Sequence, residues 1–181
     1  FENLSLPKKF ILFVGSRLKY KNFRFFIESY ASSKLIKEEF KIVCFGDENF
    51  SNEEKIFFSK LNIEKKIYHH QGSDHLLSFL YKKAKLFIFP SQYEGFGIPL
   101  IEAMFLGCPV LASDINVFQE IGKNGINYFI NNDRNNLIEN LEYLLGNEKN
   151  LYSKVSLAQK ISGKYSWKNC ANQTLEVYKK I

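Results

Sequence analysis

Short apolar runs recur along this chain, and stretches with helical spacing separate them. Six runs have the length of strands: residues 10–14, 41–45, 66–70, 86–89, 109–112 and 127–130. Most of them are nearly continuous in their apolar character rather than alternating, which is typical of parallel strands that are covered on both faces. The pattern therefore predicts a buried parallel sheet.

Helical stripes fill the intervals between these runs. Apolar side chains recur with helical spacing within residues 76–84 and again within 137–145, where Gly146 closes the pattern. A last helix begins at Ser166, a good N-cap, and carries four apolar side chains on one face: Trp167, Ala171, Leu175 and Tyr178. The alternation predicts an α/β fold, a doubly wound (Rossmann-like) parallel sheet of about six strands with helices on both faces. We find no repeat, low-complexity tract or linker, so residues 1–181 are expected to form a single domain.

The composition is that of one globular domain with a sizeable core: 181 residues, 45% hydrophobic and 24% charged, with a net charge of +6. Six basic residues fall in a short stretch without any acid: Lys8, Lys9, Arg17, Lys19, Lys21 and Arg24. Such a run fits phosphate binding, an anionic membrane surface, nucleic acid, or simply a solvated face. Nucleic-acid binding is disfavoured because the chain has no helix-turn-helix, RNP or zinc-finger pattern.

Cysteine usage and hydropathy bear on the compartment. The three cysteines Cys44, Cys108 and Cys170 are odd in number and form no CxxC, so we expect buried free thiols in a reducing cytosol. No apolar run reaches about 18 residues, so neither a transmembrane helix nor a signal peptide is expected. The predicted location is the cytoplasm, and the basic surplus also suits the anionic inner face of a membrane.

Ligands of open parallel sheets bind beyond the carboxyl ends of the strands. This rule nominates the loops 15–21, 46–49, 70–74 and 90–99. The fourth loop opens the peptide EGFGIPLIEAM, residues 94–104, in which Pro99 suits the first turn of a helix. Gly95 and Gly97 would let an anion approach the unpaired amides of that helix tip closely. The peptide matches neither GxGxxG nor a P-loop, which disfavours dehydrogenases and P-loop enzymes.

Two acids flank this helix tip. Glu102 could reach past a bound phosphate to a hydroxyl pair such as a ribose diol, and Glu94 could accept hydrogen bonds from a sugar. Alternatively both carboxylates only favour the helix dipole. The spacing alone leaves both interpretations open.

The run FPSQYEGFGIPLIEAMFLGCPVLAS, residues 89–113, resembles the donor-binding half of retaining, nucleotide-sugar-dependent glycosyltransferases of family 4, which have the two-domain GT-B fold. Three further segments resemble the same half: FVGSRLKYKNF, GSDHLLSFLYKKAKLFIFPS and YSWKNCANQTLEVYKKI. The resemblance spans nearly the whole chain. It implies that residues 1–181 are a C-terminal donor-binding domain and that an N-terminal acceptor domain lies outside this chain.

The resemblance assigns roles to the fourth loop. Glu94 and Glu102 look like the family's acid-x7-acid pair, in which Glu102 would hold the ribose hydroxyls and Glu94 would face the transferred sugar. The amides around Gly95, Phe96, Gly97 and Ile98 would hold the diphosphate and the sugar.

The resemblance also assigns roles to the other strand ends. Lys21 matches the lysine that contacts the diphosphate. The family's arginine directly follows the strand glycine, whereas here Ser16 intervenes and Arg17 comes one position later. The remaining donor contacts are expected at glycines that end strands: Gly15, Gly46 and Gly72.

The function implied is transfer of a hexose from a UDP-, GDP- or ADP-sugar to a glycan or lipid-linked acceptor in polysaccharide biosynthesis. We expect no cofactor and no metal, since the chain has no DxD, and His69 and His70 would point to opposite faces of a strand. Lys21, Arg17 and the helix amides would offset the charge that grows on the leaving diphosphate. The isolated domain is expected to bind donor without transferring sugar. Alternative interpretations are a non-catalytic nucleotide-sugar binding module and a GT-B-like sugar-nucleotide epimerase.

Overall fold

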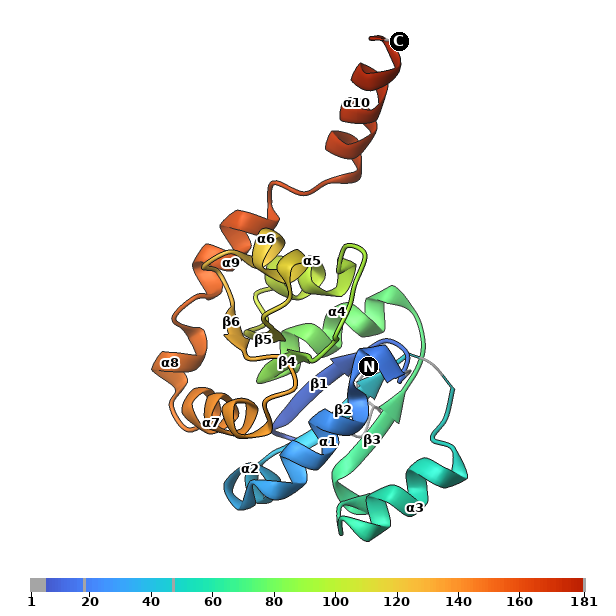
Figure 1. Ribbon diagram of the computed structural model, residues 1–181, viewed down its shortest axis with the longest axis vertical. Helices are drawn as coiled ribbons and strands as arrows, with labels where there is room; N and C mark the ends of the chain where they lie inside the picture. The colour runs from blue at the N-terminus through green and yellow to red at the C-terminus, as the bar shows by residue number, and fades with distance from the viewer. Residues whose placement is uncertain (1–5, 18, 47, 181) are drawn as a thin grey trace.

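The computed structural model describes residues 6–17, 19–46 and 48–180. Six parallel strands form one sheet in the order β3-β2-β1-β4-β5-β6 (Figure 1). Their bounds are β1 Phe10–Val14, β2 Lys41–Phe45, β3 Ile67–His70, β4 Leu86–Phe89, β5 Val110–Ser113 and β6 Asn127–Phe129. The expected six-stranded parallel sheet is confirmed, and each strand lies within one residue of its expected bounds.

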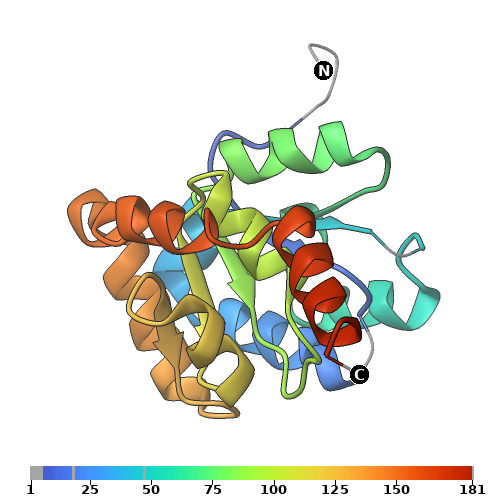
Figure 2. The ribbon, with the colours of Figure 1, turned by 90° about the horizontal axis from the view of Figure 1, so that it is seen from above.

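Helices cover both faces of this sheet. One face carries α4 Asp74–Lys83, α5 Ile98–Phe105, α6 Asn116–Gly122 and α9 Val155–Ser162. The other face carries α1 Phe23–Ser32, α2 Lys34–Glu39, α3 Asn52–Lys60, α7 Arg134–Leu145 and α8 Glu148–Tyr152. The view from above shows α4 and α1 on opposite sides of the strands (Figure 2). Two short 3₁₀ turns, η1 Lys19–Lys21 and η2 Glu64–Lys66, complete the body.

Alternation along the central strand divides the core in two. Leu12 of β1 packs under α4 and α5, whereas its neighbours Ile11 and Phe13 pack under α1 and α7. All three side chains are at most 1% exposed. Burial of one such side chain contributes about 1.5–3 kcal/mol, so both helical layers are held on the sheet by many such contacts. This explains why the apolar runs are nearly continuous.

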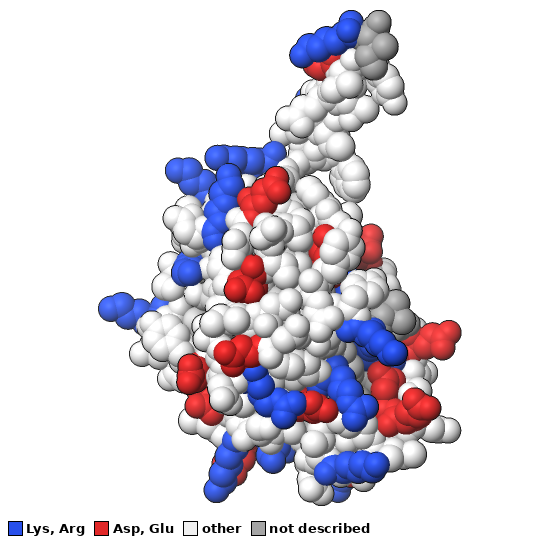
Figure 3. Space-filling view, in the orientation of Figure 1, with Lys and Arg blue, Asp and Glu red and all other residues white. Residues whose placement is uncertain are grey.

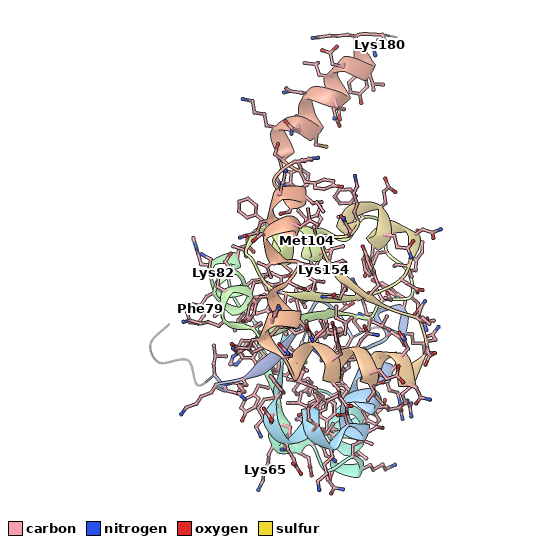
Figure 4. All side chains as sticks on the ribbon, turned by 90° about the vertical axis from the view of Figure 1, so that its left-hand side faces the viewer. Lys65, Phe79, Lys82, Met104, Lys154 and Lys180 are labelled. Atoms are coloured by element: carbon pink, nitrogen blue, oxygen red, sulfur yellow. The ribbon has the colours of Figure 1, made fainter. Side chains whose placement is uncertain are left out.

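The last helix, α10 Trp167–Tyr178, begins at its expected N-cap Ser166, whose hydroxyl accepts from the Asn169 amide. It projects from the body as an arm (Figure 1), and its surface is mostly uncharged except near the tip (Figure 3). Lys180 marks that tip in Figure 4, whereas Met104 of α5 is buried in the body. Cys170 lies on the arm and is exposed, so the prediction that all three cysteines are buried is wrong for this residue.

The basic run at the start of the chain does not form one bare cationic surface. Four of its six residues pair with carboxylates that the structure describes: Lys9 with Glu39, Arg17 with Glu54, Lys21 with Glu94 and Arg24 with Glu28. Basic and acidic side chains are also interspersed on the face that Figure 3 shows. Most of these basic side chains are therefore neutralised by carboxylates within the fold.

Candidate functional site

The order of the strands creates a crevice at the carboxyl edge of the sheet. Chain order runs outward from β1 to β3 on one side and from β4 to β6 on the other, so the direction of winding reverses between β1 and β4. In doubly wound sheets ligands bind at such a switch point. The loops that follow these two strands, residues 15–22 and 90–97, carry the basic loop and the glycine loop.

Gly15 ends β1 in a conformation that brings Lys21 back over the strand end. Its φ is +110°, and its amide donates to the Phe45 carbonyl at 2.9 Å. A side chain at this position would approach the Lys21 Nζ, because an ideal Cβ would lie 3.9 Å from that atom. The Nζ also lies 5.3 Å from the centre of the Phe89 ring, at the end of β4. Lys21 therefore sits directly over the switch point.

Glu94 meets Lys21 there. The Lys21 Nζ donates to Glu94 Oε1 at 2.7 Å, and the Ser91 hydroxyl donates to the same oxygen at 2.7 Å. Both side chains of the ion pair are 12% exposed. An ammonium group carries three N–H donors, so Lys21 can hold Glu94 and a phosphate oxygen together.

The two glycines of the fourth loop occupy their positions for different structural reasons. Gly97 is the N-cap of α5 with φ +91°, and a Cβ there would lie 3.1 Å from the Phe118 ring. Gly97 is therefore required by the fold. A Cβ on Gly95 would meet no described atom within 4 Å. Because Gly95 has no side chain, the space at the helix tip stays open, and Phe96 and Ile98 beside it are both about half exposed.

Glu102 lies in the second turn of α5, half-buried beside α4. Its Oε2 accepts from the Tyr81 hydroxyl at 3.3 Å. Burial raises the pKa of the Glu102 carboxyl; the Tyr81 hydrogen bond opposes this rise, and the nearby Asp74 carboxylate adds to it. Glu102 and Glu94 thus belong to one helix-tip region but have separate partners.

Arg17 is held in a different contact from Lys21. Its Nε donates to Glu54 Oε1 at 2.5 Å, and its Nη2 donates to the Glu48 carbonyl at 2.9 Å. The guanidinium also lies 5.0 Å from the centre of the Phe50 ring. Glu54 is the capping-box residue of α3, so Arg17 ties the loop after β1 to the loop after β2.

The other predicted glycines lie at neighbouring strand ends. A Cβ on Gly46, which has φ +94°, would lie 3.6 Å from the Gly15 Cα, so these two loops touch. The His69 ring nitrogen lies 2.9 Å from the Gly46 carbonyl oxygen. Gly72 adjoins Leu76 at the start of α4: an ideal Cβ on Gly72 would lie 3.2 Å from the Leu76 Cδ2. Gly46 therefore adjoins the Lys21 loop, whereas Gly72 borders α4.

Sequence reasoning missed an amide junction beside the site. The Asn132 Oδ1 accepts from Asn22 Nδ2 at 3.0 Å and from Gln92 Nε2 at 2.9 Å. In addition, the backbone N–H of Gln92 donates to the Tyr20 carbonyl at 2.8 Å. These contacts join the loops after β1, β4 and β6. No spacing motif marks them, because three amides far apart in sequence meet only in the folded chain.

Tyr81 and Ser91 were also missed. Tyr81 has the spacing of an ordinary core position in α4, and Ser91 follows a strand like any turn residue. Neither type of residue signals a contact with Glu102 or Glu94 from sequence.

Among the described residues, no group of three or more His, Cys, Asp or Glu side chains is arranged to hold a metal ion. The helices in these ranges include none long and apolar enough to cross a membrane.

Comparison with known proteins identifies the family. The family model described as "Glycosyl transferases group 1" matches residues 1–160. The chain belongs to the group 1 glycosyl transferases. A similar family member is the O-antigen chain mannosyltransferase RfbU of Salmonella typhimurium, which is 34% identical over 143 residues, 76% of this chain and 39% of that protein. The chain thus spans less than half the length of this curated relative.

Solved glycosyltransferase structures share the fold. Sucrose-phosphate synthase from Thermosynechococcus elongatus matches with a TM-score of 0.84 at 22% identity, over 99% of this chain and 47% of that one. Anabaena HepE, crystallised in complex with UDP and glucose, matches with a TM-score of 0.81 at 18% identity, over 96% of this chain and 49% of that one. The expected fold class is confirmed: the chain forms one Rossmann-like domain of the GT-B type.

Proposed function

We propose that this group 1 glycosyl transferase chain is the C-terminal donor-binding domain of a retaining family 4 enzyme. It binds a nucleoside diphosphate sugar, whose hexose passes to a glycan or lipid-linked acceptor without a metal ion. The observation that carries the proposal is the contact between Lys21 and Glu94 at the switch point between β1 and β4, beside the glycine-opened tip of α5.

The diphosphate is the first part of the donor to account for. Its negative charge grows as the glycosidic bond breaks, and a cation at about 4 Å stabilises a unit charge by roughly 4 kcal/mol at an effective dielectric of about 20. Lys21 supplies that cation in the proposal. The amides around Gly95, Phe96, Gly97 and Ile98 add the partial positive charge of the helix N-terminus.

The two glutamates divide the rest of the donor between them. Glu94 is held by Lys21 and Ser91 at the mouth of the glycine loop, so we assign it to the hydroxyls of the transferred sugar. Glu102 lies in the second turn of α5 and contacts Tyr81 rather than that ion pair, so we assign it to the ribose hydroxyls. Separating the two carboxylates in this way limits their repulsion of the diphosphate.

Arg17 is a second candidate cation for the diphosphate. Its Nε and Nη2 hold Glu54, so a contact with the diphosphate would either use another N–H of the guanidinium or replace that carboxylate. We assign Gly15, Gly46 and Gly72 to the nucleoside side of the donor, because each follows a strand at the same edge of the sheet.

The proposal includes an acceptor-binding domain outside this chain. Because the chain spans less than half of its relatives, we expect it to bind donor without turnover on its own. The name of the Salmonella relative makes a mannosyl donor one candidate, and the ligands of the Anabaena structure make a UDP-sugar another.

Calorimetry on the 181-residue chain tests the proposal. The panel is GDP-mannose, UDP-glucose and ADP-glucose, each measured with and without a chelator. We expect one nucleotide class to bind equally in both conditions. Lys21→Ala and Glu102→Ala should each weaken this binding at least tenfold, since each removes a charged partner worth about 1.5–3 kcal/mol.

Lys85→Ala is the matched control. Lys85 also pairs with a glutamate, Glu148 at 2.9 Å, but it precedes β4 and so lies at the opposite edge of the sheet from the glycine loop. Its removal should leave affinity unchanged. Absence of binding to every member of the panel, or equal binding by all variants, would contradict the proposed function.

A further inference from the structure

Tyr81 is a buried tyrosine whose hydroxyl reaches toward the proposed donor site. It lies on α4 and is 1% exposed. Its ring packs edge-on against Phe87 of β4, with ring centres 5.4 Å apart. A side chain so enclosed has a fixed direction, so its hydroxyl is held in one place.

Two acceptors on α5 share this hydroxyl. The Tyr81 oxygen lies 3.3 Å from the Pro99 carbonyl oxygen, in the first turn, and 3.3 Å from Glu102 Oε2, in the second turn. A phenol has one O–H to donate, so the hydrogen bond is divided between the two acceptors or alternates between them. The contact links the helix tip and the Glu102 carboxylate to a rigid point on α4.

The groups around Glu102 show what the hydrogen bond from Tyr81 does for its carboxyl group. Burial raises the pKa of the Glu102 carboxyl, the Tyr81 hydroxyl lowers it, and Asp74 at the start of α4 raises it. The surroundings of Tyr81 itself include Glu102 and Cys108. The phenol therefore favours the ionised carboxylate against both burial and a neighbouring acid.

We propose that Tyr81 is a positioning residue for donor binding: its hydroxyl holds the Glu102 carboxylate in the orientation that receives the ribose hydroxyls. This inference rests on the proposed function of Glu102. Tyr81 acts through Glu102 and through the tip of α5, and it does not itself touch the donor.

The test replaces only the hydroxyl. Tyr81→Phe in the 181-residue chain should weaken binding of the preferred nucleotide sugar by about three- to tenfold, the effect typical of one lost hydrogen bond. In the Glu102→Ala background the same change should cause no further loss, because the residue through which Tyr81 acts is gone. Equal affinity of Tyr81→Phe and the unmodified chain, or fully additive losses, would overturn the role of Tyr81.

Tyr30→Phe is the matched control for loss of a buried hydroxyl. Tyr30 is 0% exposed and donates to the Phe40 carbonyl at 2.7 Å, in the core on the other face of the sheet. It should lower stability without changing nucleotide affinity. A comparable loss of affinity in Tyr30→Phe would overturn the inference, because Tyr81 would then act only as a structural tyrosine.

A second readout does not depend on nucleotide. Carboxyl-carbon NMR titration should show the pKa of Glu102 rising further in Tyr81→Phe, and an unchanged pKa would overturn the inference. Failure of the unmodified chain to bind any nucleotide sugar would overturn the proposed function, and with it the ribose role. Binding by the unmodified chain that Tyr81→Phe leaves intact would overturn the inference alone.

Discussion

Lys21 and Glu94 are 73 positions apart in the chain, yet Lys21 Nζ lies 2.7 Å from Glu94 Oε1. One follows β1 and the other follows β4, and these strands are neighbours only because the winding of the sheet reverses between them. The two charges are mostly shielded from water, so each depends on the other in the absence of donor.

The pair predicts a stability effect. Lys21→Met leaves Glu94 with the Ser91 hydroxyl but without its cation, and should lower the free energy of unfolding by about 2 kcal/mol, between the values of exposed and buried pairs. The double variant Lys21→Met/Glu94→Gln should be less destabilised than the sum of its single variants. Urea unfolding measures this, and strict additivity would show that the pair contributes nothing.

Substitution of the two glycines of the fourth loop by alanine should affect stability very differently. Gly95→Ala adds a methyl group into open space, so stability should change by less than about 0.5 kcal/mol. Its donor affinity should fall at least tenfold, because the methyl group occupies the space proposed for the phosphate. Calorimetry and thermal unfolding of one sample provide both numbers.

Gly97→Ala is the counterpart to that variant. A positive φ and the Phe118 ring 3.1 Å from its added Cβ should cost about 1–2 kcal/mol or more of stability. A Gly95→Ala chain that binds donor normally would show that the open space is not part of the site.

Donor affinity should depend on pH through Glu102. Burial raises the pKa of this carboxyl above its ordinary 4.5, and only the ionised form accepts freely from two ribose hydroxyls. Affinity should therefore be full at neutral pH and decline as pH falls through the raised pKa, before an ordinary glutamate would protonate. Calorimetry across this range should show the decline, and Glu102→Gln should abolish it.

The same shift has the opposite sign for stability. Because the folded pKa is raised, the unfolded chain loses this proton first, and stability decreases as pH rises from 4.5 through the folded value. Glu102→Gln should thus be more stable than the unmodified chain at neutral pH while binding donor more weakly. A less stable Glu102→Gln would contradict this account.

The amide junction predicts a longer-range effect. Asn132 adopts φ +61°, so Asn132→Gly keeps the backbone and removes the acceptor shared by Asn22 and Gln92. The stability loss should be about 1 kcal/mol, and donor affinity should fall because the loops carrying Lys21 and Glu94 lose a common anchor.

Asn62→Gly is the control for that substitution. Asn62 has φ +54° in the exposed turn after α3, so it undergoes the same chemical change away from the junction. Its donor affinity should remain that of the unmodified chain. Equal affinities in both variants would show that the junction supports only the fold.

Much of the fold could be read from the sequence because its signals are local. The strand bounds follow from apolar runs of at most five residues, so each strand can be recognised from its own residues alone. The tip of α5 is equally local: Pro99 fits the first turn, and Gly97 supplies the positive φ of its N-cap. Family resemblance then attached donor-binding roles to Glu94, Glu102 and Lys21, and these remain predictions.

The tertiary structure decided which of these pieces meet. Strand order is set by how helices pack on two faces, and no run of residues encodes that β1 lies beside β4. The contacts of Arg17 with Glu54, of Tyr81 with Glu102 and of Asn132 with two amides arise from side chains distant in sequence. Sequence determined the elements and their chemistry because those depend on near neighbours. Only the folded sheet determined the pairings, because they depend on distance in space.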